Sequence, residues 1–205
     1  MRDMSKYSNI SVGVLALQGD YECHKKQLDK LGVPNRYVRL PEHLENIDAL
    51  IFPGGESTTM SKLIDRFDLR EKLTQFGQAK PIWGTCAGMI LLSIEIEANQ
   101  AEVKPLGLID IKVARTAYGR QVFSFETDLR IDFPNGQKSC TVAFIRAPRI
   151  LSTGENVKIL ARYENEAVLV EKDNILTSSF HSELDDDTTL LEYFLDNFLV
   201  DKVKI

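Results

Sequence analysis

The sequence has few cysteines, no long apolar run and no apolar stretch at its start. Its three cysteines are an odd number without a close pairing pattern, so they do not form a disulfide framework. No apolar run approaches the roughly 18 to 20 residues that span a bilayer. Residues 1–10 lack the apolar core of a signal peptide. We therefore expect a cytoplasmic protein with reduced thiols.

The chain of 205 residues also lacks internal repeats, low-complexity segments and a linker rich in Gly, Ser or Pro. Its formal net charge of −5 gives no support to general nucleic-acid binding. We expect a single domain over residues 10–205, preceded by a loose N-terminal tail at residues 1–9. We expect no membrane contact, no metal and no cofactor.

The first half of the sequence alternates between apolar strands and helical segments. Short apolar runs at residues 11–17, 49–52 and 81–83 are typical of strands, the first of them buried on both faces, and residues 35–40 are expected to form a further strand. A helix is expected at about residues 21–31, with Asp20 as its candidate N-cap, and another is expected to start at Ser57 or Thr58. This alternation predicts an α/β fold, a three-layer sandwich whose mixed, mostly parallel sheet has helices on both faces.

The second half is richer in strand-like segments with short polar connections. They lie at residues 109–113, 123–129, 141–145, 157–162, 167–171 and 175–179. We expect them to be antiparallel additions to the same sheet. A final amphipathic helix, at about residues 188–199, places four side chains in one apolar stripe, which predicts core packing for Leu191, Phe194, Leu195 and Phe198.

The segment Gly-Thr-Cys-Ala-Gly, residues 84–88, follows a short strand and precedes a helical pattern. It is similar to a nucleophile elbow, in which small neighbours permit a strained backbone that exposes the reactive atom, here Cys86. The dipole of the following helix favours the thiolate, and the backbone N–H of Ala87 can stabilise an oxyanion. A small buried cysteine is the alternative, and it is the favoured interpretation for Cys23 and Cys140.

A nucleophilic thiol needs a base that is held in the right tautomer. Of the three histidines, His24 in the first helix and His43 in a charged connection are both expected to be solvated. His181 follows an apolar strand and precedes Glu183 by two positions, so both side chains point to the same side of an extended chain. His181 and Glu183 are therefore candidates for the base and its orienting carboxylate.

The segment Pro-Gly-Gly-Glu-Ser, residues 53–57, follows the third strand. Its two glycines allow a close approach of the backbone, and the Gly55 N–H is a candidate second oxyanion donor. An ordinary glycine-rich turn between strand and helix is the alternative. Phosphate binding is disfavoured, because no lysine follows as a Walker motif would need.

Six segments carry a more specific resemblance: GVLALQGD at residues 13–20, PGGESTTM at 53–60, WGTCAGM at 83–89, AYGRQVFSFE at 117–126, FIRAP at 144–148 and SFHSEL at 179–184. Together they resemble the family of glutaminase subunits of pyridoxal 5′-phosphate synthase, over nearly the whole chain. The cysteine elbow and the His-x-Glu pair are common to class I glutamine amidotransferases. The LQGD, YGRQ with SFE, and FIRAP segments point to the vitamin B6 branch.

The resemblance implies a flavodoxin-like class I amidotransferase fold and a catalytic triad of Cys86, His181 and Glu183. It implies that Gln18 lies where the oxyanion hole is completed when a synthase subunit docks. The implied partner is a (β/α)8-barrel subunit in a large ring-shaped hetero-oligomer, without which the glutaminase is nearly silent. The glutamine pocket is expected to be lined by Gly55, Glu56, Ser57, Arg115, Ile145 and Arg146.

Two positions depart from the family pattern. Ser182 stands between His181 and Glu183 where proline is usual, and Thr116 stands where asparagine is common. Proline would fix φ, so serine leaves the geometry of the pair less constrained. Neither change removes a member of the expected triad.

Two other functions remain as alternatives. One is a class I glutaminase that serves a different synthase, such as the imidazole glycerol phosphate enzyme. The other is a non-catalytic flavodoxin-like or DJ-1-like module with a redox-sensing cysteine, which leaves the pair His181 and Glu183 unexplained.

Overall fold

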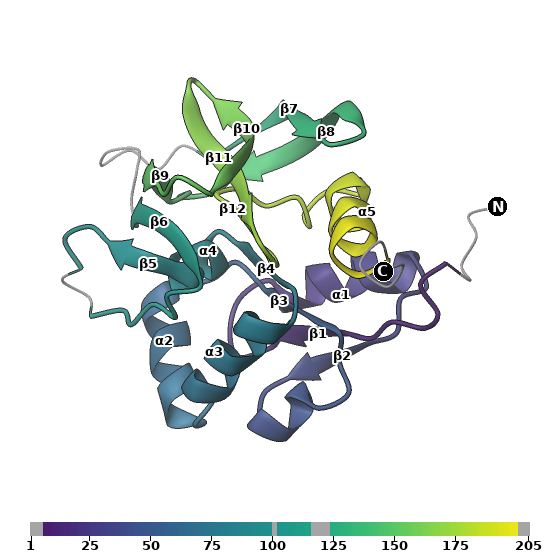
Figure 1. Cartoon of the computed structure of the whole chain (residues 1–205), viewed down its shortest axis with the longest axis vertical. Coiled ribbons are helices and arrows are strands. Elements are labelled where there is room, and N and C mark those ends of the chain that lie inside the picture. The colour runs from purple at the N-terminus through teal and green to yellow at the C-terminus, as the bar shows by residue number, and fades with distance from the viewer. Residues whose placement is uncertain (1–5, 100–101, 116–123, 201–205) are drawn as a thin grey trace.

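The computed structural model describes residues 6–99, 102–115 and 124–200. Its largest sheet has seven strands in the order β10-β11-β12-β4-β3-β1-β2 (Figure 1). The five strands from β12 to β2 are parallel, whereas β11 and β10 continue the sheet in antiparallel pairing. Their bounds are β1 Val12–Leu15, β2 Asn35–Val38, β3 Ala49–Phe52, β4 Ile82–Thr85, β10 Lys158–Tyr163, β11 Glu166–Lys172 and β12 Ile175–Ser178.

Helices cover both faces of this sheet, which confirms the predicted three-layer α/β fold. The helices α1 (Tyr21–Lys30) and α5 (Thr189–Leu195) contribute to one apolar cluster. The helices α2 (Ser57–Arg66), α3 (Arg70–Ala79) and α4 (Ala87–Leu92) contribute to a second cluster. Because β1, β3, β4 and β12 lie between these clusters, every residue in them is buried, as their apolar sequences predict.

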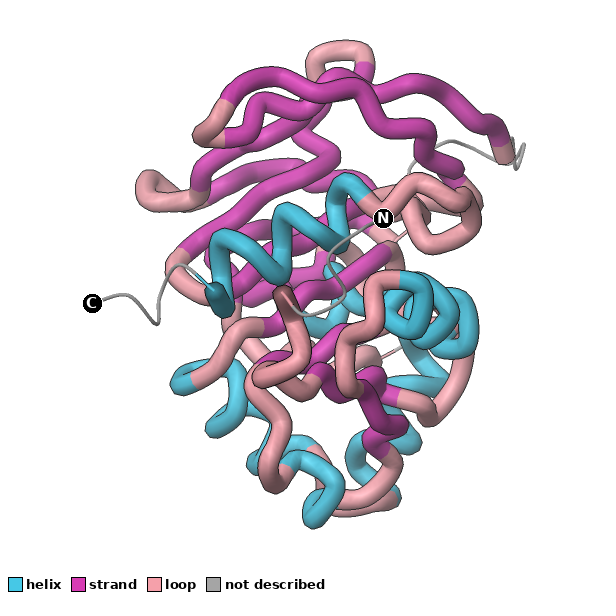
Figure 2. The backbone as a smooth tube through the Cα atoms, turned by 90° about the vertical axis from the view of Figure 1, so that its right-hand side faces the viewer, coloured by secondary structure: helices cyan, strands magenta, loops and turns pink. Residues whose placement is uncertain are grey.

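The remaining described strands form two smaller sheets. Strands β5 (Ser93–Ile96), β6 (Ile109–Ala114) and β9 (Arg149–Thr153) form one, and the hairpin of β7 (Phe125–Phe133) and β8 (Gly136–Phe144) forms the other. Figures 1 and 2 show this hairpin at the same end of the molecule as β10 and β11.

The prediction that all later strands extend the main sheet was therefore wrong for β6, β7 and β8. Strand β12 also differs from the prediction, since it pairs parallel with β4. An alternating pattern identifies a half-buried strand, as in β6, but it does not identify the neighbour with which the strand pairs. The strands β5 and β9, the helix α3 and the short 3₁₀ helix at Pro41–Leu44 were not predicted.

The two ends of the described chain meet on the α5 side. Residues 6–9, which we expected to belong to a loose tail, form a turn in which Tyr7 is buried and donates a hydrogen bond to Asp196 at 2.9 Å. The helix α5 continues as a π-helical turn at Asp196–Val200. The stripe predicted for this helix is buried, which confirms its core role for Leu191, Phe194, Leu195 and Phe198.

Within the part of the chain that the structure describes, no helix has both the length and the apolar character needed to cross a membrane. Asp20 occupies the N-cap position of α1, as predicted, but its side chain makes no capping hydrogen bond.

Helix α2 begins at Ser57, as predicted, and Glu56 caps it. The Glu56 carboxylate accepts hydrogen bonds from the backbone N–H groups of Thr58 at 3.0 Å and Thr59 at 2.7 Å. Burial alone would raise the pKa of Glu56, but the donors on Thr59 and Thr58 outweigh burial and lower it to about 2. The turn between β3 and α2 therefore carries a fixed negative charge.

This cap predicts a pH-dependent contribution to stability. The pKa of Glu56 is lower in the fold than the ordinary 4.5, so its carboxylate stabilises the fold above pH 4.5 and loses this effect as pH falls toward 2. Because the side chain is 46% exposed, we expect Glu56→Gln to cost only about 1 kcal/mol near neutral pH. Urea unfolding at about pH 7 and about pH 3 should show the two proteins converging in acid. A stability difference that does not change with pH would contradict this prediction.

Candidate active site

The carboxyl ends of four neighbouring parallel strands meet at one edge of the main sheet. Strands β12, β4, β3 and β1 lie side by side in that order. They lead into residues 179–183, Cys86, residues 53–56 and residues 17–20, respectively. Chain segments that are far apart in the sequence thus converge where α/β proteins usually bind ligands.

Cys86 occupies a strained turn between β4 and α4, as the sequence predicted. Its φ of 49° and ψ of −105° are unfavourable for a residue with a side chain, which is the expected feature of a nucleophile elbow. The turn is held by the Cys86 N–H, which donates to the Ser178 carbonyl at 2.8 Å. A Cβ on Gly88 would lie 2.3 Å from the Phe52 carbonyl oxygen, so the helix packs against β3 only with glycine there.

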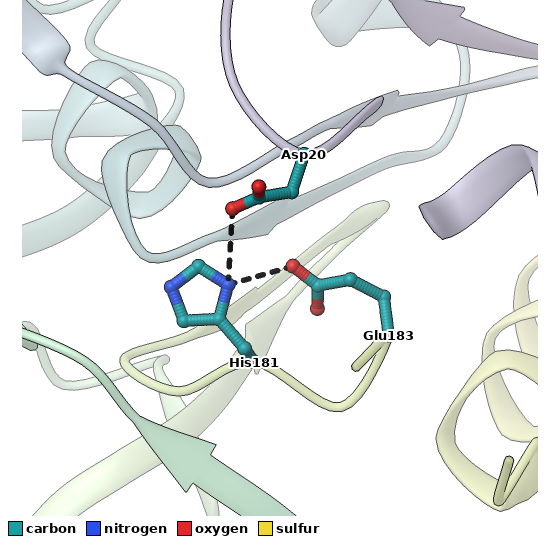
Figure 3. Close-up of side chains that lie close together, drawn as sticks. All are labelled: Asp20, His181 and Glu183. Atoms are coloured by element: carbon teal, nitrogen blue, oxygen red, sulfur yellow. Dashed lines mark hydrogen bonds and ion pairs between the residues drawn. The ribbon is translucent and has the colours of Figure 1, made fainter. Parts of the chain in front are cut away.

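His181 and Glu183 form a buried hydrogen-bonded pair (Figure 3). Nδ1 of His181 lies 2.7 Å from Oε1 of Glu183, and the two side chains are 4% and 0% exposed. The His181 backbone forms a two-bond bridge with Ala143 of β8, at 2.8 and 2.9 Å. On the other side of the ring, a Cβ on Gly54 would lie only 2.2 Å from Cε1 of His181. The imidazole is therefore fixed through both its backbone and its ring.

The electrostatics of this pair favour a charged histidine. Burial lowers the pKa of His181, but its hydrogen bonds with Cys86 and Glu183 outweigh burial and raise the pKa to about 11. Burial raises the pKa of Glu183, and the neighbouring His24 and His181 outweigh that effect and hold it below its ordinary value. A thiol, an imidazolium and a carboxylate in contact can perform nucleophilic catalysis with transfer of a proton.

Asp20 also faces the His181 ring, as Figure 3 shows. Its Oδ2 lies 3.8 Å from His181 Nδ1, and ligand atoms of Asp20, His181 and Glu183 lie within 4.8 Å of one another. A metal ion could use that spacing. It would have to break the 2.7 Å contact between His181 and Glu183, however, so the geometry fits a hydrogen-bonded pair better.

A cavity of about 690 Å³ opens in front of Cys86 and His181. Glu183 lies behind the His181 ring and is not among the lining residues. All other residues that the sequence assigned to the site line this cavity, namely Gln18, Gly55, Glu56, Ser57, Cys86, Ala87, Arg115, Ile145, Arg146 and His181. Thr116 and most of the segment 117–126 lie outside the described residues.

The polar wall of the cavity is built around Arg115. Its guanidinium donates to Ser57 Oγ at 3.1 Å, to Thr58 Oγ1 at 2.9 Å and to Glu56 Oε1 at 3.2 Å. Arg146 also lines the cavity and has a positive φ of 46°. A carboxylate and two guanidinium groups therefore border one cavity, which suits a ligand that carries both charges.

Gln18 braces the glycine-rich turn. Its Oε1 accepts a hydrogen bond from the Glu56 N–H at 2.7 Å, and the Asp20 N–H donates to the Gly54 carbonyl at 3.0 Å. Gly19, with φ of 97°, lets these two turns approach each other, because a Cβ there would lie 1.8 Å from the Gly54 carbonyl oxygen. The turns after β1 and β3 thus form one hydrogen-bonded unit.

The expectation that His24 is solvated was wrong. Its side chain is 1% exposed, and Nε2 lies 3.2 Å from Thr85 Oγ1 and 3.5 Å from Glu183 Oε1. The spacing of His24 with Leu28 and Leu31 on one helical face could have predicted this burial, since both leucines are in the core. His43, for which the same was expected, is half-buried.

The other two cysteines have different surroundings from Cys86. Cys140 is buried in β8, and burial raises the pKa of its thiol to about 12. Cys23 is half-buried on α1, and burial together with the carboxylate of Asp20 raises its pKa. Neither thiol is suited to act as a nucleophile, because the thiolate is the reactive form.

Comparisons with known proteins agree with this geometry. Residues 14–200 match the family model described as the SNO glutamine amidotransferase family. A relative from Thermosipho africanus, named pyridoxal 5′-phosphate synthase subunit PdxT, is 48% identical over 91% of this chain and 97% of its own length. A relative of the same name from Thermotoga maritima is 49% identical over 91% of this chain and 98% of its own length.

The fold is also similar to solved structures. A crystal structure of a glutamine amidotransferase is 45% identical, covers 90% of this chain and 97% of the other, and has a TM-score of 0.84. The structure of PurLQS from Thermotoga maritima has a TM-score of 0.68 at 15% identity, over 96% of this chain and all of the other, and is similar in fold alone. The family model and these identities over most of the chain lead to one conclusion: this chain belongs to the SNO glutamine amidotransferase family.

Proposed function

We propose that this chain hydrolyses L-glutamine to L-glutamate and ammonia through a Cys86, His181 and Glu183 triad. The observation that carries the proposal is the strained Cys86 turn beside the buried His181–Glu183 pair, at the base of a cavity with both charges on its walls. A redox-sensing cysteine module would need neither the orienting carboxylate nor the charged cavity.

In the first step the Cys86 thiolate attacks the side-chain amide carbon of glutamine, and a carbon–sulfur bond forms. The protonated His181 then donates its proton to the leaving nitrogen, the carbon–nitrogen bond breaks, and ammonia departs. Glu183 keeps Nδ1 of His181 protonated, so that Nε2 faces the reacting groups. The raised pKa of His181 supports an imidazolium at the start of the reaction.

In the second step His181, now neutral, takes a proton from water. The resulting hydroxide attacks the γ-glutamyl thioester, the carbon–sulfur bond breaks, and glutamate is released. The Cys86 thiolate and the protonated His181 are restored. The two steps together consume one glutamine and one water.

Both steps pass through a tetrahedral oxyanion, whose negative charge must be stabilised by hydrogen-bond donors. We assign this role to the backbone N–H groups of Ala87 and Gly55, from the elbow and from the glycine-rich turn. Gln18 acts on the second donor, because its hydrogen bond to the Glu56 N–H fixes the turn next to Gly55.

For the substrate, we assign the α-ammonium group to Glu56 and the α-carboxylate to Arg115 and Arg146. The carboxylate of Glu56 remains charged over the whole neutral range, which suits an ammonium partner. Ser57 and Ile145 also line this cavity.

We further propose that the ammonia is used by a partner synthase. The relatives are named as subunits of pyridoxal 5′-phosphate synthase, which supports a partner in vitamin B6 biosynthesis. We propose that this partner is a (β/α)8-barrel subunit within a large hetero-oligomer. Ammonia is mostly protonated in water at neutral pH and is then a poor nucleophile, so direct transfer is required. We place the chain in the cytoplasm, with residues 10–205 as one domain to which the turn at residues 6–9 also belongs.

The proposed role of Cys86 as nucleophile predicts the effect of replacing its side chain on glutamate release. Cys86→Ala should lower glutamate release from glutamine by about 10³-fold or more, since the whole covalent route is lost. Release should be measured with the synthase subunit present, and Cys23→Ala is the matched control that should keep full activity. Equal rates for Cys86→Ala and wild type would remove the central role of Cys86.

If Arg115 binds the α-carboxylate of glutamine, its loss should weaken substrate binding more than it slows the chemical steps. Arg115→Ala should raise KM for glutamine about tenfold, the cost of one charge-assisted hydrogen bond, with kcat within about threefold of wild type. Arg162→Ala, at a surface position of β10, is the control for loss of a positive charge. An unchanged KM would show that the α-carboxylate binds elsewhere.

The partner proposal predicts selective binding. Tagged chain should co-purify the barrel subunit of pyridoxal 5′-phosphate synthase from a mixture that also contains the imidazole glycerol phosphate synthase subunit. Glutaminase activity should rise in the presence of the first subunit only. Recovery and activation by the second subunit would favour the other amidotransferase branch.

A further inference from the structure

The loop at residues 182–187, which carries Glu183, is held by side chains of α1. Nε2 of Gln27 donates to the carbonyl oxygens of Ser182 at 3.0 Å, Asp185 at 3.1 Å and Asp187 at 3.1 Å. Lys30, one turn further along α1, donates to the Asp186 carbonyl at 2.8 Å. Four carbonyl groups of this six-residue loop thus accept hydrogen bonds from one helix.

The Gln27 contacts are specific in their geometry. The residue is only 5% exposed although its side chain is polar, and it lies 155 to 160 positions from its partners in the sequence. All three partners are acceptors, so the amide nitrogen, not the oxygen, must face the loop. Two N–H groups shared among three carbonyls fix the loop backbone on both sides of Glu183.

His24 lies one helical turn before Gln27 and reaches the carboxylate itself. Nε2 of His24 is 3.5 Å from Glu183 Oε1 and 3.2 Å from the hydroxyl of Thr85, the residue before Cys86. Its ring packs edge-on against Trp83 of β4, with centroids 5.4 Å apart and an interplanar angle of 82°. His24 therefore links the strand that carries the nucleophile to the carboxylate that orients the base.

Ser182 makes such support necessary. Serine does not restrict φ, so the backbone between His181 and Glu183 has no local constraint of the kind that a proline ring would impose. Glu183 must nevertheless keep its 2.7 Å contact with His181 in a site from which water is excluded. A displacement of about 1 Å in such a site can lower the rate about 10²-fold.

We propose that α1 is the positioning element of the catalytic pair: Gln27 fixes the loop backbone around Ser182, and His24 fixes the Glu183 carboxylate. Neither residue touches the substrate cavity. Both act through Glu183 on the orientation of His181. The inference deepens the proposed glutaminase function and rests on it.

The test measures glutamate release by the chain bound to its synthase subunit. Gln27→Ala and His24→Leu should each lower kcat about tenfold, with KM for glutamine within about twofold, because the substrate pocket is untouched. His24→Gln, which keeps an N–H donor, should recover most of the loss seen with His24→Leu. Lys26→Ala, at an exposed position of the same helix, is the matched control and should equal wild type.

A double-substitution cycle separates positioning from general packing. In a chain that already carries Ser182→Pro, the proline ring fixes φ at position 182. The loop then depends less on Gln27, so the further substitution Gln27→Ala should lower kcat by about twofold or less. Thermal unfolding should confirm that each variant is folded at the assay temperature. An effect of Gln27→Ala that is equally large with and without Ser182→Pro would overturn the proposal.

Folded Gln27→Ala or His24→Leu chains with a kcat equal to wild type would overturn it as well. Failure of the proposed function gives a different result, since the wild type would then release no glutamate, or Cys86→Ala would release it at the same rate.

Discussion

The hydrogen bond between His181 and Glu183 joins two groups that are almost completely removed from water. Taking a carboxylate and an imidazolium out of water costs several kcal/mol for each ion, and only good geometry with further polar contacts offsets that cost. The surrounding structure holds the two side chains in this geometry. Strand β8 bridges the His181 backbone, Gly54 packs against its ring, and His24 lies beside the Glu183 carboxylate. The proposed reaction at Cys86 depends on this geometry, because His181 must be oriented to transfer a proton.

The sheet determines where this pair lies relative to Cys86, the proposed nucleophile. Strand β12 ends just before His181 and pairs in parallel register with β4, which ends just before Cys86. The Cys86 N–H is bonded to the Ser178 carbonyl, so the two strand ends are locked together at their last residues. The glycine-rich turn after β3 and the Gln18 turn after β1 follow in the same row. The residues that we propose for catalysis, for oxyanion stabilisation and for substrate binding thus follow neighbouring strands of one sheet.

Much of this arrangement could be predicted from the sequence, because local patterns carry it. The apolar strands, the Cys86 elbow and the start of α2 all follow from short segments, and the structure places them as expected. The partners of half-buried strands could not be predicted, as β6, β7 and β8 show. His24 was missed because residue type alone suggested solvation, whereas its helical spacing with Leu28 and Leu31 places it in the interior. The contact of Gln27 with a loop 155 residues away has no local signal at all.

The most direct test of this account is to look for the covalent intermediate. The chain, bound to its synthase subunit, is mixed with glutamine, quenched in acid within the first turnovers, digested and analysed by mass spectrometry. The account predicts a γ-glutamyl thioester on the peptide that contains Cys86, and no adduct on that peptide when Cys86→Ala is treated in the same way. Glutamate release without any thioester on Cys86, or an adduct on Cys23 or Cys140 in its place, would contradict it.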